Sequence, residues 1–359
     1  MLPRGGGGDG RLQHSSLSTD SAGGQAAPTE GHGRTLHTPW FFARVLLQLQ
    51  TNEKVGPLKE RVAGYVSDKD RYRWLGRVNE NYGDLLRNKW FFHQFFGHRE
   101  IPTPTYYGNY HHRRGRWIDG SRLCSGEDIL AALDNSAVDA LVIKPVVGSG
   151  GNKVMIFSDI IGGKLIDSSG RAWTAGELAD ALGKGDYIFE EWVEQHAELS
   201  ALYPHSLNTV RITTLNDGEQ ALPWAAVLRV GTAKSGSVDN WGRGGLSVAL
   251  DVQSGELGCG VVSVKHLAGL PESTTEHPDT GCEFAGRVLP NWQTVLDTVS
   301  RVAALVPGLP YIAWDVAITE DGCRIIEGNH RPDVNLLQVH GGLLTADKHV
   351  HWWQEHLPR

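Results

Sequence analysis

The sequence predicts an α+β protein with largely antiparallel strands, preceded by a helical segment. Between residues 140 and 328, short runs rich in valine and isoleucine alternate with glycine-containing loops, as in strands joined by turns. Residues 40–96 instead repeat apolar side chains at three- and four-residue steps, which is typical of helices. Glycine accounts for 44 of 359 residues, well above the usual share of about 7%. This excludes a helical bundle, and the length suggests two domains or subdomains of roughly 100–200 residues each.

The first 38 residues differ in composition from the rest of the chain. They contain nine of the glycines and many serines and threonines, they show no apolar periodicity, and their charges cancel. Such a segment cannot bury a core, so residues 1–38 are expected to form a disordered tail. They also lack the apolar stretch of a secretory signal, and a transit peptide is the alternative. Residues 39–88 are expected to form a helical N-terminal segment.

Eight strands and two helices are expected in the remainder of the chain. A proline-rich turn at residues 101–108 separates them from the helical segment. Apolar, β-branched runs predict strands at residues 140–147, 153–157, 187–193, 208–215, 225–231, 246–252, 311–319 and 323–328. Helical periodicity predicts helices at residues 175–184 and 291–306.

Charge and cysteine content exclude several classes of protein. The 34 basic and 41 acidic residues give a net charge of −7 without a basic run, which argues against a nucleic-acid or anionic-membrane binder. No stretch approaches the roughly 18 apolar residues of a membrane span. The four cysteines are widely spaced and form no CxxC pair, which argues against a zinc ribbon or a thioredoxin-type site. A cytoplasmic protein with free thiols is expected.

The segment YIAWDVAITEDGCRIIEGNH (residues 311–330) predicts a hairpin with acidic residues on one face. Period-two alternation places Asp315 between Ala313 and Ala317, on the face opposite the core-forming side chains. A three-residue loop, Glu320–Gly322, would pair Thr319 with Cys323 and hence Asp315 with Glu327.

Two carboxylates directly opposite each other repel, and a divalent cation removes the conflict. Asn329, two residues after Glu327, offers a third oxygen on the same face. A ligand set of oxygens alone favours Mg²⁺ or Mn²⁺ over zinc. An edge hairpin with solvated acids is the structural alternative.

The segment ALVIKPVVGSGG (residues 140–151) places Lys144 late in an apolar strand, before a glycine-rich loop. The backbone of Gly148, Ser149, Gly150 and Gly151 can approach an anion closely, and the ammonium adds positive charge. No Walker A motif is present, and a purely structural turn is the alternative. A lysine on a buried strand needs a polar partner, which strengthens the functional interpretation.

Two further strands carry polar residues. Glu190 and Glu191, at the end of an apolar strand, indicate a segment that lines a cleft, where backbone groups could contact an adenine edge; a solvated strand end fits equally well. Arg211 shares one strand face with Thr209 and Thr213, and an arginine in mid-strand pairs with a phosphate or with a carboxylate of the sheet.

Taken in order, these segments resemble the ATP-grasp superfamily, in particular the branch called sugar-transfer-associated ATP-grasp or α-L-glutamate-ligase-related proteins. The resemblance runs from about Lys89 to Gly342. It rests on five segments: NKWFFHQFFGHREIPTPTYYG, VIKPVVGSGG, FEEWVEQHAELSALYPHSLNTVRITTL, VDNWGRGGLSVALDV and the set Asp315, Glu327 and Asn329.

The resemblance implies two α+β subdomains that enclose ATP. Residues 89–185 would form the first, with a glycine-rich lid at Gly148–Gly151, and residues 186–345 the second, followed by a C-terminal helix at 346–359. Lys89 and Lys144 would contact the α- and β-phosphates, and Arg211 the γ-phosphate. The hinge would be Glu190, Glu191, Trp192 and Val193, of which Glu191 and Val193 meet adenine through their backbones. Glu198 or Glu194 would bind the ribose, and Asp315, Glu327 and Asn329 the magnesium ions.

The activity implied is that of an ATP-dependent ligase. A small-molecule or peptide carboxylate would attack the γ-phosphate, and the acyl phosphate would react with an amine to give an amide, ADP and phosphate. Lys144 and Arg211 would be the catalytic cations. A kinase acting on a small hydroxylated molecule and a non-catalytic nucleotide-binding module are the alternatives. The second is disfavoured because the lysines, Arg211 and the metal ligands are all present. The acid, the amine and the oligomeric state are not predicted.

The chain departs from most ATP-grasp ligases before the ATP-binding part. Residues 39–88 have helical periodicity where a Rossmann-like domain is usual, so the substrate would be held by the body of the protein. Candidate substrate contacts are Asn240, Arg243, Gly244 and Gly245 in the segment VDNWGRGG, and Arg331, whose guanidinium suits a carboxylate. Ordinary loop positions are the alternative for all five.

Overall fold

A computed structural model describes residues 64–67, 71–72, 75, 77–79, 81–148, 150–262, 273–344, 350–352 and 355. The chain divides into compact units at residues 1–38 and 39–359, and every described residue belongs to the second. The tail expected at 1–38, most of the helical segment expected at 39–88, Ser149 and most of the helix expected at 346–359 lie outside the described residues. No helix in the described ranges is both long and apolar enough to cross a membrane.

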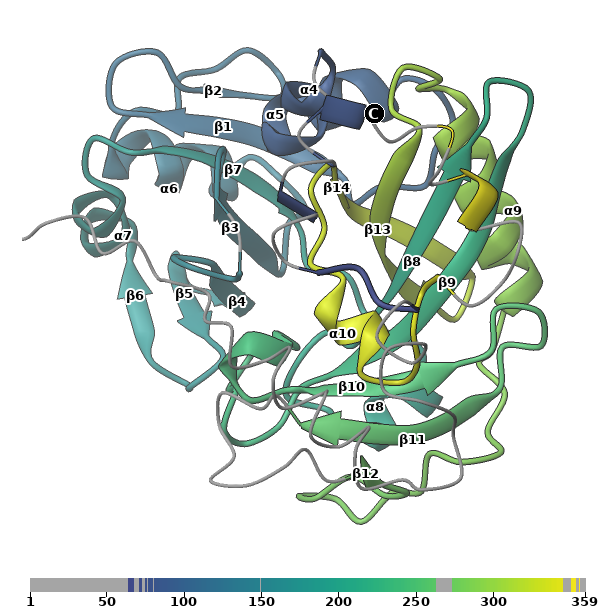
Figure 1. The fold of residues 1–359 in the computed structure, drawn as a ribbon. Coiled ribbons are helices and arrows are strands. Elements are labelled where there is room, and N and C mark those ends of the chain that lie inside the picture. Colours follow the sequence, from purple (N-terminus) through teal and green to yellow (C-terminus); the bar gives the residue numbers. More distant parts are fainter. Residues whose placement is uncertain are drawn as a thin grey trace, which may run out of the picture. The chain divides into compact units, whose positions relative to one another are not determined.

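The first sheet has seven antiparallel strands. Their order is β2 (Arg116–Trp117), β1 (Tyr106–His111), β7 (Asp186–Glu191), β3 (Leu141–Pro145), β4 (Met155–Ile161), β5 (Lys164–Asp167) and β6 (Ala172–Thr174). Helices α6 (Gly126–Asp134) and α7 (Ala175–Leu182) contribute Ile129, Leu178 and Leu182 to the core of this sheet (Figure 1). Thr174 begins α7 with a capping box, in which its side chain and that of Glu177 exchange hydrogen bonds with each other's backbone N–H.

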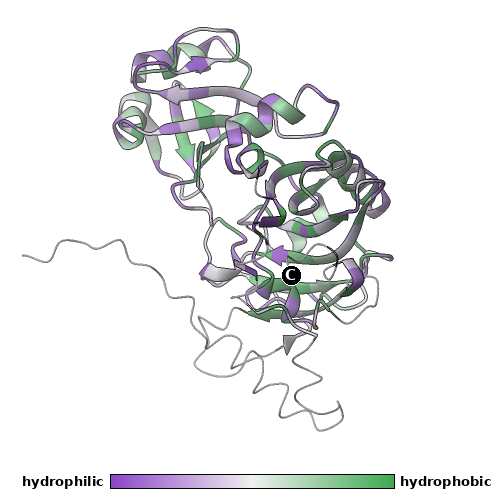
Figure 2. Cartoon of the chain, turned by 45° about the horizontal axis from the view of Figure 1, so that its top comes forward, coloured by the Kyte–Doolittle hydropathy of each residue, from purple (hydrophilic) through white to green (hydrophobic). Residues whose placement is uncertain are grey.

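The second sheet also has seven antiparallel strands. Their order is β12 (Ser273–Thr274), β11 (Leu257–Val262), β10 (Leu246–Leu250), β9 (Ala221–Val230), β8 (Thr209–Asn216), β13 (Tyr311–Thr319) and β14 (Gly322–Asn329). Helix α9 (Trp292–Ala304) packs beside β8, β9 and β13 and buries Val295, Val299 and Val302 (Figure 1). Figure 2 shows hydrophobic and hydrophilic residues interspersed on the strands and helices. The predicted α+β class is therefore confirmed.

Five further short helical elements have described bounds. They are α4 (Gly83–Arg87), α5 (Lys89–Phe96), α8 (Ala197–Leu202), α10 (Asn335–Gln338) and a 3₁₀ turn, η1 (Trp241–Arg243). The eight predicted strands and two predicted helices are all present; the strand at 311–319 has its predicted bounds, and the other elements have shifted ends. The prediction for residues 101–108 is wrong in part, because Tyr106 begins β1. This strand was missed because its polar, half-buried residues lack the β-branched run that marks the others.

The hairpin of β13 and β14 differs from the prediction in its register. Thr319 pairs with Gly322 instead of Cys323, so the loop has two residues, and Cys323 pairs with Ile318. A bulge then follows, because Val316 pairs with Ile325 whereas Asp315 pairs with Glu327, which leaves Ile326 unpaired. The predicted opposition of Asp315 and Glu327 is thus confirmed, but it results from a shorter turn compensated by a bulge.

A half-buried histidine beside this sheet makes stability depend on pH. The Ser247 hydroxyl donates to the Leu336 carbonyl at 2.7 Å and lies 3.0 Å from His340 Nε2, so Nε2 carries the proton and donates to Ser247. Burial lowers the pKa of His340 to about 4.

The neutral form of His340 is therefore the one that the fold favours. We expect the free energy of unfolding to decrease as the pH falls from about 6.5, the ordinary histidine value, to about 4, with His340 contributing up to about 3 kcal/mol of the loss. His340→Gln keeps an N–H donor but does not titrate, so urea unfolding at several pH values should show a shallower decrease. Identical pH profiles for the two proteins would contradict this assignment.

Candidate nucleotide and metal site

A cavity of about 690 Å³ is lined by strands of both sheets. From the first sheet, β3 contributes Val142 and Lys144, and β7 contributes Glu190 and Glu191. The second sheet contributes Thr209 of β8, Arg229 of β9, Asp315 of β13 and Glu327 of β14. The structure therefore brings residues from four of the predicted motifs to one cavity.

Lys89 lies at the start of helix α5, where a side-chain cap fixes the backbone. Asn88 Oδ1 accepts hydrogen bonds from the N–H groups of Trp90 and Phe91, and the Lys89 N–H donates to the Val146 carbonyl at 2.9 Å. The Lys89 ammonium donates to the Gly148 carbonyl at 3.1 Å and lies 3.6 Å from Glu327 Oε2. This single side chain thus contacts both the glycine-rich loop and a predicted metal ligand.

Lys144 has the polar partner that its buried strand requires. Its ammonium pairs with Glu190 Oε1, while Glu190 Oε2 lies 3.0 Å from His93 Nε2. Burial, the largest influence, raises the pKa of Glu190, but the Lys144 charge and the contact with His93 outweigh it and lower the pKa to about 2. Glu190 is therefore an ionised carboxylate whose side chain is 2% exposed.

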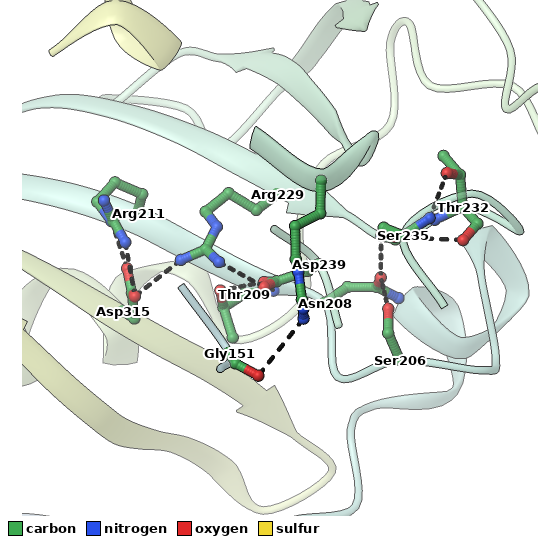
Figure 3. A network of polar contacts seen from close by, with 12 residues as sticks. Gly151, Ser206, Asn208, Thr209, Arg211, Arg229, Thr232, Ser235, Asp239 and Asp315 are labelled. Atoms are coloured by element: carbon green, nitrogen blue, oxygen red, sulfur yellow. Dashed lines mark hydrogen bonds and ion pairs between the residues drawn. The ribbon is translucent and has the colours of Figure 1, made fainter. Parts of the chain in front are cut away.

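Asp315 is surrounded by positive charge (Figure 3). It pairs across the sheet with Arg211 on one side and with Glu327 on the other. Arg211 donates through Nε to Oδ1 and through Nη2 to Oδ2, the latter at 2.7 Å, and Arg229 Nη1 donates to Oδ2 at 2.8 Å. Burial opposes ionisation, yet the two guanidinium groups hold the pKa of Asp315 well below its usual range.

Arg211 thus pairs with a carboxylate of the sheet, the structural alternative to a phosphate contact. It is not among the described residues that line the cavity. A direct contact with the γ-phosphate stays a prediction. Because Arg211 and Arg229 together occupy one bonding position on Oδ1 and two on Oδ2, Asp315 keeps acceptor capacity on Oδ1.

Sequence reasoning missed Arg229. Unlike Arg211, Arg229 is among the described residues that line the cavity. Its guanidinium joins two carboxylates, since Nη1 donates to Asp315 and Nη2 donates to Asp239 at 2.5 Å. Asp239 also accepts from the N–H and the hydroxyl of Thr209, so the four groups form one network (Figure 3). The neighbouring acids raise the pKa of Arg229 against the effect of burial. The signal was present, because Arg229 is also an arginine within an apolar strand.

The donor set on the second sheet fits a divalent cation. Asp315 and Glu327 lie opposite each other, and Asn329 follows Glu327 on the same face. Asn329 Nδ2 is buried and has no hydrogen-bond partner in the described part of the chain. Within the described ranges no three side chains of His, Cys, Asp or Glu are grouped to hold a metal, and Asn329 is not among the described residues that line the cavity. Asn329 as the third ligand stays a prediction. An all-oxygen set of this kind suits Mg²⁺ or Mn²⁺.

The predicted hinge follows β7. Trp192, Val193 and Glu194 all line the cavity, whereas Glu198, on α8, is not among the described lining residues, which favours Glu194 as the ribose ligand. The Glu191 N–H donates to the Thr105 carbonyl at 2.9 Å, so a contact between Glu191 and adenine would have to use its carbonyl oxygen.

The glycine-rich loop lies along the cavity. Gly148, Gly150 and Gly151 line it, and the positive φ angles of the last two, 71° and 70°, explain why glycine is required there. Its predicted serine, Ser149, lies outside the described residues.

The predicted substrate residues fall into three groups. Asn240 lines the cavity, and Arg243 donates from Nη1 to the Gly151 carbonyl at 3.4 Å, so it contacts the glycine-rich loop. Gly244 has a φ of 109°, and a Cβ on Gly245 would approach the Asp239 carbonyl to 2.9 Å, so both glycines serve the local backbone. Arg331 is exposed and is not among the described lining residues.

Comparisons with known proteins identify a family. A family model described as sugar-transfer associated ATP-grasp matches residues 70–351. No curated protein matches the chain.

Solved structures that match this chain include ATP-grasp ligase PsnB complexed with a minimal precursor, Mg and ADP (13% identity, 87% of this chain and 72% of that chain covered, TM-score 0.38). N5-carboxyaminoimidazole ribonucleotide synthetase from Thermotoga maritima is 12% identical over 74% of this chain, with a TM-score of 0.37, and the match spans half of that enzyme's length. L-amino acid ligase from Bacillus licheniformis is 14% identical over 70% of this chain and 42% of its own, with a TM-score of 0.36.

Proposed function

Because the chain belongs to the sugar-transfer associated ATP-grasp family and has the ATP-grasp fold, we propose that it is an ATP-dependent ligase that joins a carboxylate to an amine. The observation that carries the proposal is the convergence of Lys89, Lys144 and the Asp315–Glu327 pair on one cavity lined by both sheets. Two lysines supply positive charge for a polyphosphate, and paired carboxylates beside an asparagine supply oxygens for Mg²⁺.

Each group of residues at the cavity has its own proposed role. Lys89 and Lys144 bind phosphate oxygens, and the hinge from Glu191 to Val193 holds the base through its backbone. Asp315, Glu327 and Asn329 hold Mg²⁺, which offsets charge on the phosphates when it is bound. Gly148–Gly151 cover the phosphates and exclude water from the reacting groups. Arg211 and Arg229 hold Asp315 in place and keep it ionised.

The proposed reaction has two steps. A carboxylate oxygen of the substrate attacks the γ-phosphorus, the bond to ADP breaks, and an acyl phosphate forms. The amine then attacks the acyl carbon, phosphate leaves and the amine loses a proton, which gives an amide. The same cavity could transfer the phosphoryl group to a hydroxyl, so a kinase remains the second candidate. The substrates that we propose are a small-molecule or peptide carboxylate and an amine, and the proposed location is the cytoplasm.

A trapping assay tests the ligase proposal. The full chain is incubated with ATP, Mg²⁺, hydroxylamine and a panel of amino acids and short peptides, because hydroxylamine converts an acyl phosphate into a hydroxamate. With at least one carboxylate of the panel as substrate, we expect both hydroxamate and ADP to form. Transfer of phosphate to an alcohol without hydroxamate would contradict the ligase proposal and support a kinase. Mass spectrometry of the product formed in a cell extract would then identify the natural acid.

A further inference from the structure

His93, on helix α5, lies outside the roles assigned above. Its Nε2 is 3.0 Å from Glu190 Oε2, while the other oxygen of Glu190 accepts from the Lys144 ammonium. The three side chains are 3%, 2% and 14% exposed, respectively, so little water competes for their hydrogen bonds. The His93 ring also packs against Tyr106 of β1, with their centroids 5.5 Å apart. His93 is therefore fixed in place as well as hydrogen-bonded.

Helix α5 carries Lys89 as well as His93, and its backbone is hydrogen-bonded next to the strand that carries Lys144. Lys89 and His93 are four residues apart and share one face of α5. Lys89 contacts Gly148 and Glu327, and its N–H donates to Val146, directly after the strand that carries Lys144. The contact between His93 and Glu190 is thus the second point at which α5 is tied to the wall of the cavity.

The chemistry of the carboxylate shows what the histidine does. Glu190 has two oxygens, and His93 engages one of them, which leaves the other for the ammonium. Without His93, the second oxygen would have no side-chain donor among the described residues, and the carboxylate could turn to bind the ammonium with both oxygens. Lys144 would then be drawn toward Glu190 and away from the cavity.

We infer that His93 is a positioning residue for nucleotide binding, which acts through Glu190 to keep the Lys144 ammonium directed into the cavity. The inference rests on the proposed function in that it takes Lys144 as a phosphate ligand. It needs no knowledge of the acid or the amine, because it concerns only the binding of ATP. A purely structural histidine would affect stability and leave the affinity for ATP unchanged.

The experiment measures the Kd for ATP in the presence of Mg²⁺ by calorimetry, on the full chain without other substrates. H93L removes the donor, H93Q keeps an N–H donor at the position of Nε2, and H98L makes the same change at an exposed histidine of the same segment. We expect H93L to weaken ATP binding about tenfold, H93Q to stay within about threefold of the wild type, and H98L to have no effect. H93L should cost less than about threefold in a Glu190→Gln background, because the effect passes through Glu190.

Several results would overturn the inference. These are a wild-type Kd in H93L, an H93Q that binds as weakly as H93L, or a full tenfold loss that persists in the Glu190→Gln background. If H93L does not fold, H93N replaces it, because its amide is too short to reach Glu190. A wild-type chain that binds no ATP would overturn the proposed function as well, whereas unchanged binding in H93L alone would overturn only the role of His93.

Discussion

Replacing Glu327 by glutamine is expected to lower ATP turnover by at least about 100-fold while the fold survives. Glutamine keeps the shape of the side chain and removes only its charge. The charge matters because Glu327 lies opposite Asp315, in the donor set that fits Mg²⁺, and 3.6 Å from the Lys89 ammonium. The measurement is the steady-state release of ADP at saturating ATP, with the carboxylate identified by the trapping assay.

Two controls separate the site from general effects of charge removal. Glu219→Gln makes the same change at an exposed position outside the cavity lining and should leave turnover unchanged. Thermal unfolding of Glu327→Gln should remain cooperative, since its strand keeps its pairing. Turnover close to that of the wild type in Glu327→Gln would refute the metal site on β14.

Replacing Arg229 by methionine is expected to have the largest effect on stability. Methionine fills much of the space of the side chain but leaves Asp315 without one of its two arginines and Asp239 without its guanidinium partner. Removing one member of a buried ionic network typically costs about 3–5 kcal/mol, because an unpaired charge remains in the interior. Urea unfolding at neutral pH would measure the loss.

Arg324→Met is the matched control for this prediction. Arg324 pairs with Asp321 at 2.9 Å near the exposed turn of the β13–β14 hairpin, where the Asp321 side chain is 68% exposed. Exposed pairs contribute about 0–1 kcal/mol, so this variant should unfold close to the wild type. Equal losses in the two variants would show that Arg229 does not hold a buried network together.

Much of the second sheet could be predicted from the sequence. The apolar alternation in residues 311–319 gave the exact bounds of β13, and the face that carries Asp315 followed from the period of two. The turn was harder, since Glu320–Gly322 suits a three-residue loop whereas the chain forms a two-residue loop and a bulge. Local turn preferences do not include the tertiary contacts that decide between such arrangements.

Contacts between distant segments could not be predicted in the same way. His93 and Glu190 are 97 positions apart, on a helix and a strand, and no periodicity links them. Arg229 differs from this pair, because an arginine in the middle of an apolar strand, the feature that singled out Arg211, is visible in the sequence. The partners of both arginines required the order of strands β9, β8 and β13, which antiparallel alternation alone does not determine.

The bulge at Ile326 has a consequence for what the cavity can recognise. In a regular strand, neighbouring side chains face opposite sides of the sheet, yet Ile326 and Glu327 both line the cavity. One extra residue therefore places a hydrocarbon surface and a negative charge next to each other on the same wall. A ligand that is apolar at one end and ionic at the other matches such a wall, and the position of the bulge determines where along the ligand that change in polarity must fall.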